Sequence, residues 1–284
     1  MPGMTRRMEM SESGFSVRIA ACLFALLGMI GGCDDGDGGG GIRFVEYDEL
    51  ASWVYDGVEE ALVIDVRTPE EYAAGHIVDA INVPYGAVAE TNGTPIDGGK
   101  ALLDAVPEMS TRIVLYCYGY GLDKDFAEVA VALGYTNVFR YEWGTNDWTT
   151  RDYLVIDYSS FKKWYDAYAP FEDGENVLID DLPEPWYTGE DPDHPGGHIP
   201  GAINIHLDLW GGTDGPVDGG KAFTDVVTDT SAKVVIYCGN PACGLSHLGA
   251  RTAVELGYKN VFRYRGGWQE WQDEGQALKP GLDP

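Results

Sequence analysis

An internal repeat of roughly 120 residues constrains this chain more than any other feature of its sequence. Each copy contains an apolar, strand-like run that ends in a cysteine, Ile113–Cys117 and Val234–Cys238. Each copy then continues through a glycine-rich loop and a helical stretch to nearly the same motif, at 133–141 and 256–264. A unit this long far exceeds a solenoid repeat, so the pattern predicts two duplicated domains, each with its own core.

Strands and helices alternate in both copies. Amphipathic helices are predicted at 47–55 and 159–168, each followed by a buried, β-branched strand at 62–66 and 177–180. Because hairpin signals are missing, this order predicts parallel sheets covered on both faces, that is, doubly wound α/β domains. The cysteines then lie at the carboxyl ends of strands, where open α/β folds place their ligands.

Several motifs, in the same order along the chain, resemble the rhodanese-like family. The first copy carries Asp65-Val-Arg-Thr-Pro-Glu-Glu-Tyr-Ala-Ala-Gly-His-Ile77, and the second carries Gly197–Asn204 and closes with Arg265-Gly-Gly-Trp268. The resemblance implies two tandem rhodanese-like domains, at 42–148 and 153–284. It also implies sulfur transfer through a cysteine persulfide without a cofactor, with thiosulfate, thiols or cyanide as partners. Fold alone does not establish that chemistry, because a fold can carry many functions.

The amino-terminal segment is predicted to be a targeting signal. Arginines precede an apolar run at 19–30, which is too short to span a bilayer and is typical of a signal peptide. The run is followed by Gly31-Gly32-Cys33, which resembles the lipobox of bacterial lipoproteins. The resemblance implies a signal peptide at 1–32, lipid on Cys33 and a flexible Asp/Gly-rich tether at 33–41. We therefore expect a protein of the cell envelope, anchored by lipid outside the cytoplasmic membrane or in the periplasm or outer membrane.

The charge balance limits the possible partners. The chain has 46 acidic residues against 19 lysines and arginines, a formal net charge of -27. Such a surface argues against nucleic acid as a partner and against docking on anionic lipid through protein charge. It also disfavours the approach of anionic donors such as thiosulfate.

The position of the two cysteines favours reactive sulfur. A loop that leads into a helix can direct backbone N–H groups and the helix dipole at the sulfur, and both stabilise the thiolate. We expect Cys238 to be the nucleophile and persulfide carrier, and Cys117 to be a second or vestigial site. In the first copy, Asp123 is expected near the sulfur and opposes a thiolate, while Tyr118 and Tyr120 crowd the entrance. These features predict a degraded first domain.

The second loop differs from the first in length and in its extra cysteine. Its predicted substrate-loop residues are Gly239, Asn240, Ala242, Gly244, His247 and Arg251. Cys243 is interpreted either as a resolving cysteine that forms a disulfide with Cys238 or as a structural residue. Neither loop contains the arginine or lysine that thiosulfate-using relatives carry. A Cys-x5-Arg phosphatase loop is excluded, because that position holds Asp123 or Gly244.

Other polar residues are assigned to the scaffold. The turn-orienting residues are predicted to be Asp65, Arg67, His76, Asp180 and His198. The segment 183–194 is expected to form a rigid loop with aromatic residues at its tip, and no metal site is assigned to the Asp and His residues around it. Two functions remain open: a sulfurtransferase that acts through Cys238, and a non-catalytic binding or redox-sensing module that uses a Cys238/Cys243 disulfide.

Overall fold

The computed structural model describes residues 41–55, 61–119, 121–192, 196–212 and 215–282. The predicted signal peptide, Cys33 and nearly all of the tether lie outside these ranges, as do Tyr120, Asp193 and His194. Within the described ranges, none of the helices is both long and apolar enough to cross a membrane.

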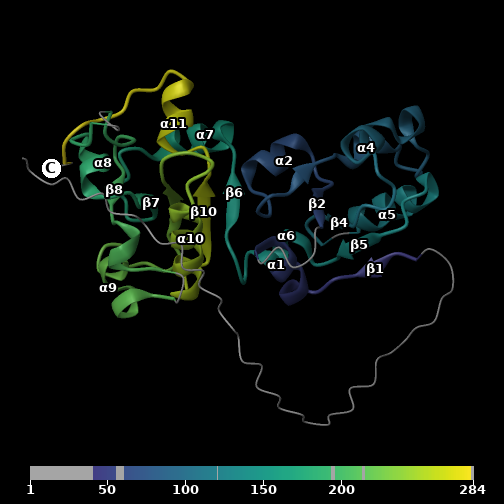
Figure 1. Ribbon diagram of the computed structural model, residues 1–284, viewed down its shortest axis with the longest axis horizontal. Coiled ribbons are helices and arrows are strands. Elements are labelled where there is room, and N and C mark those ends of the chain that lie inside the picture. Colours follow the sequence, from purple (N-terminus) through teal and green to yellow (C-terminus); the bar gives the residue numbers. More distant parts are fainter. Residues whose placement is uncertain (1–40, 56–60, 120, 193–195, 213–214, 283–284) are drawn as a thin grey trace, which may run out of the picture. The chain divides into compact units, whose positions relative to one another are not determined.

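Two five-stranded parallel sheets organise the chain, one in each predicted domain range (Figure 1). The first sheet has the order β1-β5-β4-β2-β3. Its strands are β1 (Arg43–Phe44), β2 (Leu62–Asp65), β3 (Ile81–Asn82), β4 (Ile113–Tyr116) and β5 (Val138–Tyr141). The second sheet has the equivalent order β6-β10-β9-β7-β8. Its strands are β6 (Leu154–Ile156), β7 (Asn176–Asp180), β8 (Ile203–Asn204), β9 (Lys233–Tyr237) and β10 (Asn260–Tyr264). The prediction of two parallel α/β domains is confirmed.

Short helical segments connect the strands. In the first domain these are α1 (Tyr47–Tyr55), α2 (Pro69–Ala74), α3 (Tyr85–Val88), the 3-10 helix η1 (Ile96–Gly99), α4 (Lys100–Ala105), α5 (Leu122–Leu133) and α6 (Gly144–Trp148). In the second they are α7 (Tyr158–Tyr168), α8 (Glu184–Thr188), η2 (Leu207–Leu209), η3 (Val217–Gly220), α9 (Lys221–Thr224), α10 (Leu245–Glu255) and α11 (Gly267–Asp273).

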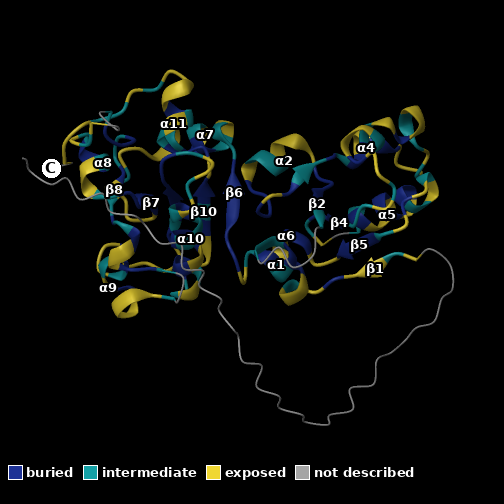
Figure 2. Cartoon of the chain, viewed as in Figure 1, coloured by how far each residue is buried: buried dark blue, intermediate teal, exposed yellow. Residues whose placement is uncertain are grey.

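Each sheet has a hydrophobic core on both of its faces, because successive side chains of a strand point to opposite sides. In β4, Ile113 and Leu115 pack with Phe126 of α5, whereas Val114 and Tyr116 pack with Leu50 of α1 on the other face. The second sheet divides its side chains in the same way. Figure 2 shows the central strands as buried and much of the helical surface as exposed. Two-sided burial explains why these strands read as continuous apolar runs in the sequence.

The segment 183–194 differs from its prediction as a rigid loop, because it begins with the helix α8. This helix corresponds to α2 of the first domain. Tyr187 of α8 donates a hydrogen bond to the carbonyl oxygen of Ala202 (2.7 Å), and Tyr72 of α2 donates to that of Ala80 over the same distance. The helical start therefore belongs to the repeat, and the extra residues of the second domain lie after Gly189.

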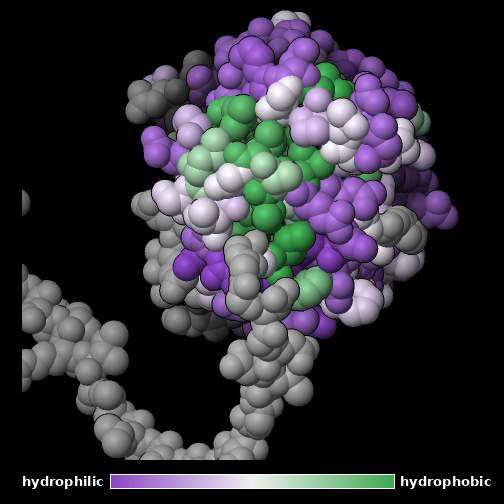
Figure 3. Space-filling model, turned by 90° about the vertical axis from the view of Figure 1, so that its right-hand side faces the viewer, coloured by the Kyte–Doolittle hydropathy of each residue, from purple (hydrophilic) through white to green (hydrophobic). Residues whose placement is uncertain are grey.

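The surface carries both hydrophilic and apolar residues. Figure 3 shows one face on which hydrophilic residues surround a central band of apolar ones. Exposed apolar residues of this kind are common, since folded proteins have too little polar surface to cover themselves.

Candidate active site

Both cysteines directly follow a central strand and are almost completely buried. Cys117 follows β4 and is 2% exposed, and Cys238 follows β9 and is 1% exposed. A glycine lies against the backbone carbonyl group of each cysteine, Gly144 at Cys117 and Gly267 at Cys238. A Cβ atom would lie 2.0 Å from the carbonyl oxygen of Cys117 if placed on Gly144, and 2.3 Å from that of Cys238 if placed on Gly267. Both glycines also have positive φ, so the third position after β5 and after β10 requires glycine.

In the first domain a carboxylate stands beside the sulfur. The thiol of Cys117 donates a hydrogen bond to Oδ1 of Asp123 (3.2 Å). Arg140 of β5 donates from Nε to Oδ2 of the same carboxylate (2.7 Å), forming a buried ion pair. The backbone N–H of Gly119 also donates to the sulfur (3.4 Å). Asp123 thus lies near the sulfur as expected from the sequence, and it compensates the charge of Arg140.

In the second domain a serine takes the place of that carboxylate. Ser246 occupies the position of Asp123 at the start of the helix, and its Oγ lies 3.1 Å from Sγ of Cys238. Arg263 of β10 occupies the position of Arg140. It donates from Nε to Oγ of Ser246 (3.0 Å) and from Nη2 to the carbonyl oxygen of Cys243 (2.9 Å). Both acceptors are neutral, so these hydrogen bonds leave the guanidinium charge available to an anion at the sulfur.

Arg140 and Arg263 were missed by the sequence analysis, which looked for a cation only in the loop after each cysteine. The structure supplies the cation from the neighbouring strand instead, with Arg140 8% and Arg263 6% exposed. The sequence did contain a signal. The motif Val-Phe-Arg-Tyr is identical in β5 and β10, and it places an arginine in an otherwise apolar buried strand of both copies. A buried arginine in a strand normally has a specific partner.

The electrostatics of the second site favour Cys243, and not Cys238, as the resting thiolate. The hydrogen bond from the Cys238 thiol lowers the pKa of Cys243 to about 6, assisted by the N–H groups of Gly239 and Leu245 and by the charge of Arg263, against the opposing effect of burial. The same hydrogen bond is the main cause that raises the pKa of Cys238. Burial and the charges of Asp181 and Cys243 raise this pKa further.

The remaining loop residues shape the backbone around the cysteine pair. The side-chain oxygen of Asn240 accepts a hydrogen bond from the backbone N–H of Ala242 (2.9 Å). The backbone carbonyl oxygen of Asn240 accepts one from the backbone N–H of Cys243 (3.0 Å). The carbonyl oxygen of Gly239 accepts from Gln269, and Gly244 immediately precedes α10. These contacts curl the loop so that Cys243 returns to Cys238.

His247 and Arg251 do not contact the sulfur, although both were predicted to be substrate-loop residues. Nδ1 of His247 lies 2.5 Å from the hydroxyl of Tyr153, and the guanidinium of Arg251 lies 4.7 Å from the centre of the Tyr55 ring. Burial, followed by the charges of Arg263 and Arg251, lowers the pKa of His247 to about 4. The helix thus presents Ser246, rather than these two residues, to Cys238.

The histidines of the two Gly-His-Ile segments are held as scaffold. His76 stacks on Tyr72 with ring centres 3.8 Å apart, and His198 stacks on Tyr187 at 3.7 Å. Nδ1 of each histidine lies within hydrogen-bonding distance of the backbone oxygen of the tyrosine on which it stacks. These contacts tie the turn to the preceding helix.

The aspartate that ends β2 has a different environment from the one that ends β7. Asp65 receives hydrogen bonds from the backbone N–H and Nε of Arg67, both 2.9 Å, and Arg67 also donates to the carbonyl oxygen of Gly75. Asp180 is fully buried, and its carboxyl group accepts a hydrogen bond from the backbone N–H of Leu182 (3.0 Å). Leu182 occupies the position that Arg67 holds in the first domain. Burial raises the pKa of Asp180 to about 7.

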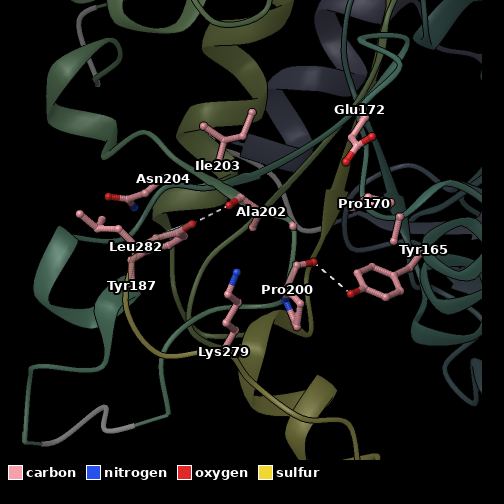
Figure 4. A pocket seen from close by; sticks show the side chains of 12 residues that line it. Tyr165, Pro170, Glu172, Tyr187, Pro200, Ala202, Ile203, Asn204, Lys279 and Leu282 are labelled. Atoms are coloured by element: carbon pink, nitrogen blue, oxygen red, sulfur yellow. Dashed lines mark hydrogen bonds between the residues drawn. The ribbon is translucent and has the colours of Figure 1, made fainter. Parts of the chain in front are cut away.

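A cavity of about 680 Å³ lies elsewhere in the second domain, beside β8 (Figure 4). Tyr187 and Tyr165 lie along its wall, each hydrogen-bonded to a backbone carbonyl, and the side chain of Lys279 points between them (Figure 4). Cys238 is not among the lining residues.

Comparison with known proteins identifies the family. The rhodanese-like domain family matches the chain twice, over residues 50–151 and 164–274. The chain therefore belongs to the rhodanese-like domain family and contains two copies of the domain.

Two named relatives illustrate the similarity. The chain is 30% identical over 110 residues to "Thiosulfate:glutathione sulfurtransferase" of Saccharomyces cerevisiae, covering 38% of this chain and 79% of the relative. It is 33% identical over 75 residues to "Thiosulfate sulfurtransferase PspE" of Escherichia coli, covering 26% of this chain and 62% of the relative. Among solved structures, it aligns with the Tum1 protein of Saccharomyces cerevisiae at 15% identity and a TM-score of 0.37, covering 85% of this chain and 99% of that one.

Proposed function

We propose that the chain is a rhodanese-type sulfurtransferase whose working site is Cys238 in the second domain. One observation carries this proposal: the buried arginine beside Cys238 is hydrogen-bonded to neutral oxygens, whereas the arginine beside Cys117 is paired with Asp123. A cation that is not bound to a carboxylate in an ion pair can stabilise the anions that form at a neighbouring sulfur during sulfur transfer. The names of the two relatives, both sulfurtransferases, support the same reaction class.

The geometry suggests how sulfur is loaded. As the donor reaches Cys238, the proton of the Cys238 thiol passes to the neighbouring Cys243 thiolate, against the resting order of the two pKa values. The Cys238 thiolate then attacks the sulfane sulfur of the donor, the sulfur–sulfur bond of the donor breaks, and sulfite or a thiolate leaves. The resulting persulfide anion lies beside Ser246 and Arg263, which stabilise its charge.

Unloading follows the reverse proton path. A thiolate or cyanide attacks the outer sulfur of the persulfide and takes it, and Cys238 leaves as a thiolate. Cys243 then returns the proton to Cys238. No cofactor is required, because the sulfur itself carries the electrons that are exchanged.

Substrates and location are proposed from the charge and the amino-terminal segment. The net charge of -27 disfavours thiosulfate at the surface, so a persulfide of a small thiol is an equally suitable donor. We place the protein in the cell envelope, attached to a membrane through lipid on Cys33. Intact mass of the protein isolated from membranes tests this placement, since lipidation adds acyl mass and removes residues 1–32.

The decisive experiment is intact mass of the reduced protein after incubation with thiosulfate or a glutathione persulfide. We expect one added sulfur, lost in Cys238→Ser and retained in Cys117→Ser. Cys117→Ser is the matched control, because it removes the equivalent residue of the other domain. Absence of added sulfur from every donor would refute the sulfurtransferase.

A second candidate, a redox module, is favoured by the closeness of the two cysteines, since the Cys238 thiol donates to the carbonyl oxygen of Cys243 (3.4 Å) and the two side chains shift each other's pKa. An oxidant such as a small disulfide would remove two electrons and two protons from the pair and join Cys238 to Cys243. The same mass measurement separates the candidates. A loss of two hydrogens under mild oxidation, without any sulfur gain from donors, would support the redox module.

A further inference from the structure

Asp181 lies beside Cys238 at the carboxyl ends of two adjacent strands. Asp180 of β7 pairs with Tyr237 of β9, so the next residue of each strand, Asp181 and Cys238, leaves the sheet at the same level. The N–H of Asp181 donates to the carbonyl oxygen of Tyr237 (3.3 Å), which continues the sheet to this point. Paired residues of neighbouring parallel strands project to the same face. The carboxyl group and the thiol are therefore neighbours.

The carboxyl group of Asp181 is buried without a partner. The residue is 0% exposed, and within the described part of the chain neither of its carboxyl oxygens has a hydrogen-bond partner. An unsatisfied buried carboxyl group destabilises a fold, so its presence requires a reason. The first domain avoids this cost, because the equivalent residue beside Cys117 is Val66.

A second difference between the domains makes room for this carboxyl group. A Cβ atom on Gly249 of α10 would lie 2.8 Å from Oδ2 of Asp181, closer than side chains tolerate. The corresponding residue of α5 is Phe126, which packs in the core together with Val66. The apolar pair of the first domain is thus replaced by an acid and a glycine in the second. The space for the acid is part of the second site alone.

The groups around Asp181 are mainly those of the cysteine pair. Burial raises the pKa of Asp181 well above its ordinary value, and the negative charges of Asp180 and Cys243 raise it further, while Arg263 opposes them. On α10, Gly249 and Ser246 contribute no charge, and Trp210, the residue after η2, packs against the same space. Asp180, Cys238, Cys243 and Arg263 are therefore the ionisable groups that set the protonation of Asp181.

We propose that Asp181 shares one proton with the Cys238–Cys243 pair and so controls when that pair carries a thiolate. The coupling acts through charge, because neither carboxyl oxygen of Asp181 has a hydrogen-bond partner in the described part of the chain. Cys243 gives up a proton as Asp181 takes one up, so the carboxylate becomes neutral as the thiol becomes a thiolate. The site keeps one negative charge opposite Arg263 in both states, and no electron is transferred. Asp181 acts through the cysteines and is a positioning residue. The inference rests on the proposed function, because it assigns a role within the Cys238 site.

The test is the pH dependence of alkylation of each cysteine in the reduced full chain, measured by mass, in wild type and Asp181→Asn. A thiol that shares a proton with a carboxyl group becomes a thiolate in two steps. We expect two steps for Cys243 in wild type. Asp181→Asn should show one step, completed about one pH unit lower, which is about tenfold in rate at a fixed pH. Cys117 in the same molecule is the control and should not change.

An unchanged two-step profile in Asp181→Asn would overturn the proposal.

Infrared titration of the wild type provides a test that needs no variant. Alkylation of Cys238 and Cys243 removes the thiolate, so the carbonyl band of a neutral carboxylic acid should titrate at lower pH. A band that does not move would also refute proton sharing. Because alkylation needs no sulfur donor, two-step behaviour without sulfur loading would refute the sulfurtransferase and leave this inference standing.

Discussion

The two domains share a fold and a cysteine position, yet they surround the sulfur with different charges. In the first domain Cys117 donates to Asp123, which already neutralises Arg140. In the second, Cys238 meets the hydroxyl of Ser246, and Arg263 keeps its charge for the site. The comparison teaches that one helix residue decides whether the strand arginine supports the protein scaffold or an anion at the sulfur.

The largest expected effect comes from placing the carboxylate of the first domain in the second. Ser246→Asp should pair with Arg263 and oppose the thiolate, reducing the rate of sulfur loading on Cys238 by about 100- to 1,000-fold. Ser246→Ala is the matched control, because it removes the hydroxyl and leaves the arginine charge unpaired. Loading is measured by intact mass against time. Equal rates in Ser246→Asp and the control would break the comparison.

The reciprocal change should open the first site at the expense of its stability. Asp123→Ser leaves Arg140 buried without its carboxylate, which should lower the free energy of unfolding by about 3–5 kcal/mol. The same change should increase alkylation of Cys117, because the carboxylate no longer opposes its thiolate. Denaturant unfolding and alkylation by mass check the two effects. Unchanged Cys117 reactivity in a folded Asp123→Ser protein would show that Asp123 does not silence this site.

A smaller effect is expected from separating the two cysteines of the second site. With a pKa of about 6, Cys243 should reach half of its maximal alkylation rate near that pH. Cys238→Ala removes the hydrogen bond that chiefly lowers this pKa, so the midpoint should rise by at least about one pH unit, a tenfold change in thiolate population. Cys117→Ala is the control and should leave the midpoint unchanged. A midpoint that stays near 6 in Cys238→Ala would contradict the paired arrangement.

The smallest effect concerns stability. Burial raises the pKa of Asp181 in the folded state above its unfolded value, so the folded chain binds more protons and loses stability as the pH rises from about 4 through the folded pKa. Asp181→Val, the residue type of the first domain, removes that loss. Its thermal midpoint should exceed that of wild type by a margin that grows with pH. A margin independent of pH would show that the carboxyl group does not titrate on folding.

Much of the fold followed from pattern alone. The repeated strand, loop and helix segments predicted two parallel α/β domains, and the runs at 62–66 and 177–180 predicted strands buried on both faces. The loop acid Asp123 was also placed correctly near the sulfur, since a helix that follows the cysteine after a short loop must begin beside it. Local order along the chain was sufficient for these conclusions.

The charges that distinguish the sites were not visible in the same way. Arg263 lies 25 positions after Cys238 in the sequence but one strand away in the sheet, and Asp181 precedes the cysteine by 57 positions yet leaves the adjacent strand beside it. The resting thiolate on Cys243 likewise depends on how the loop curls. The sequence by itself determined the two domains and the cysteine at the end of a central strand. Only the tertiary structure decided which charges face each sulfur, because parallel strands bring together residues that are distant along the chain.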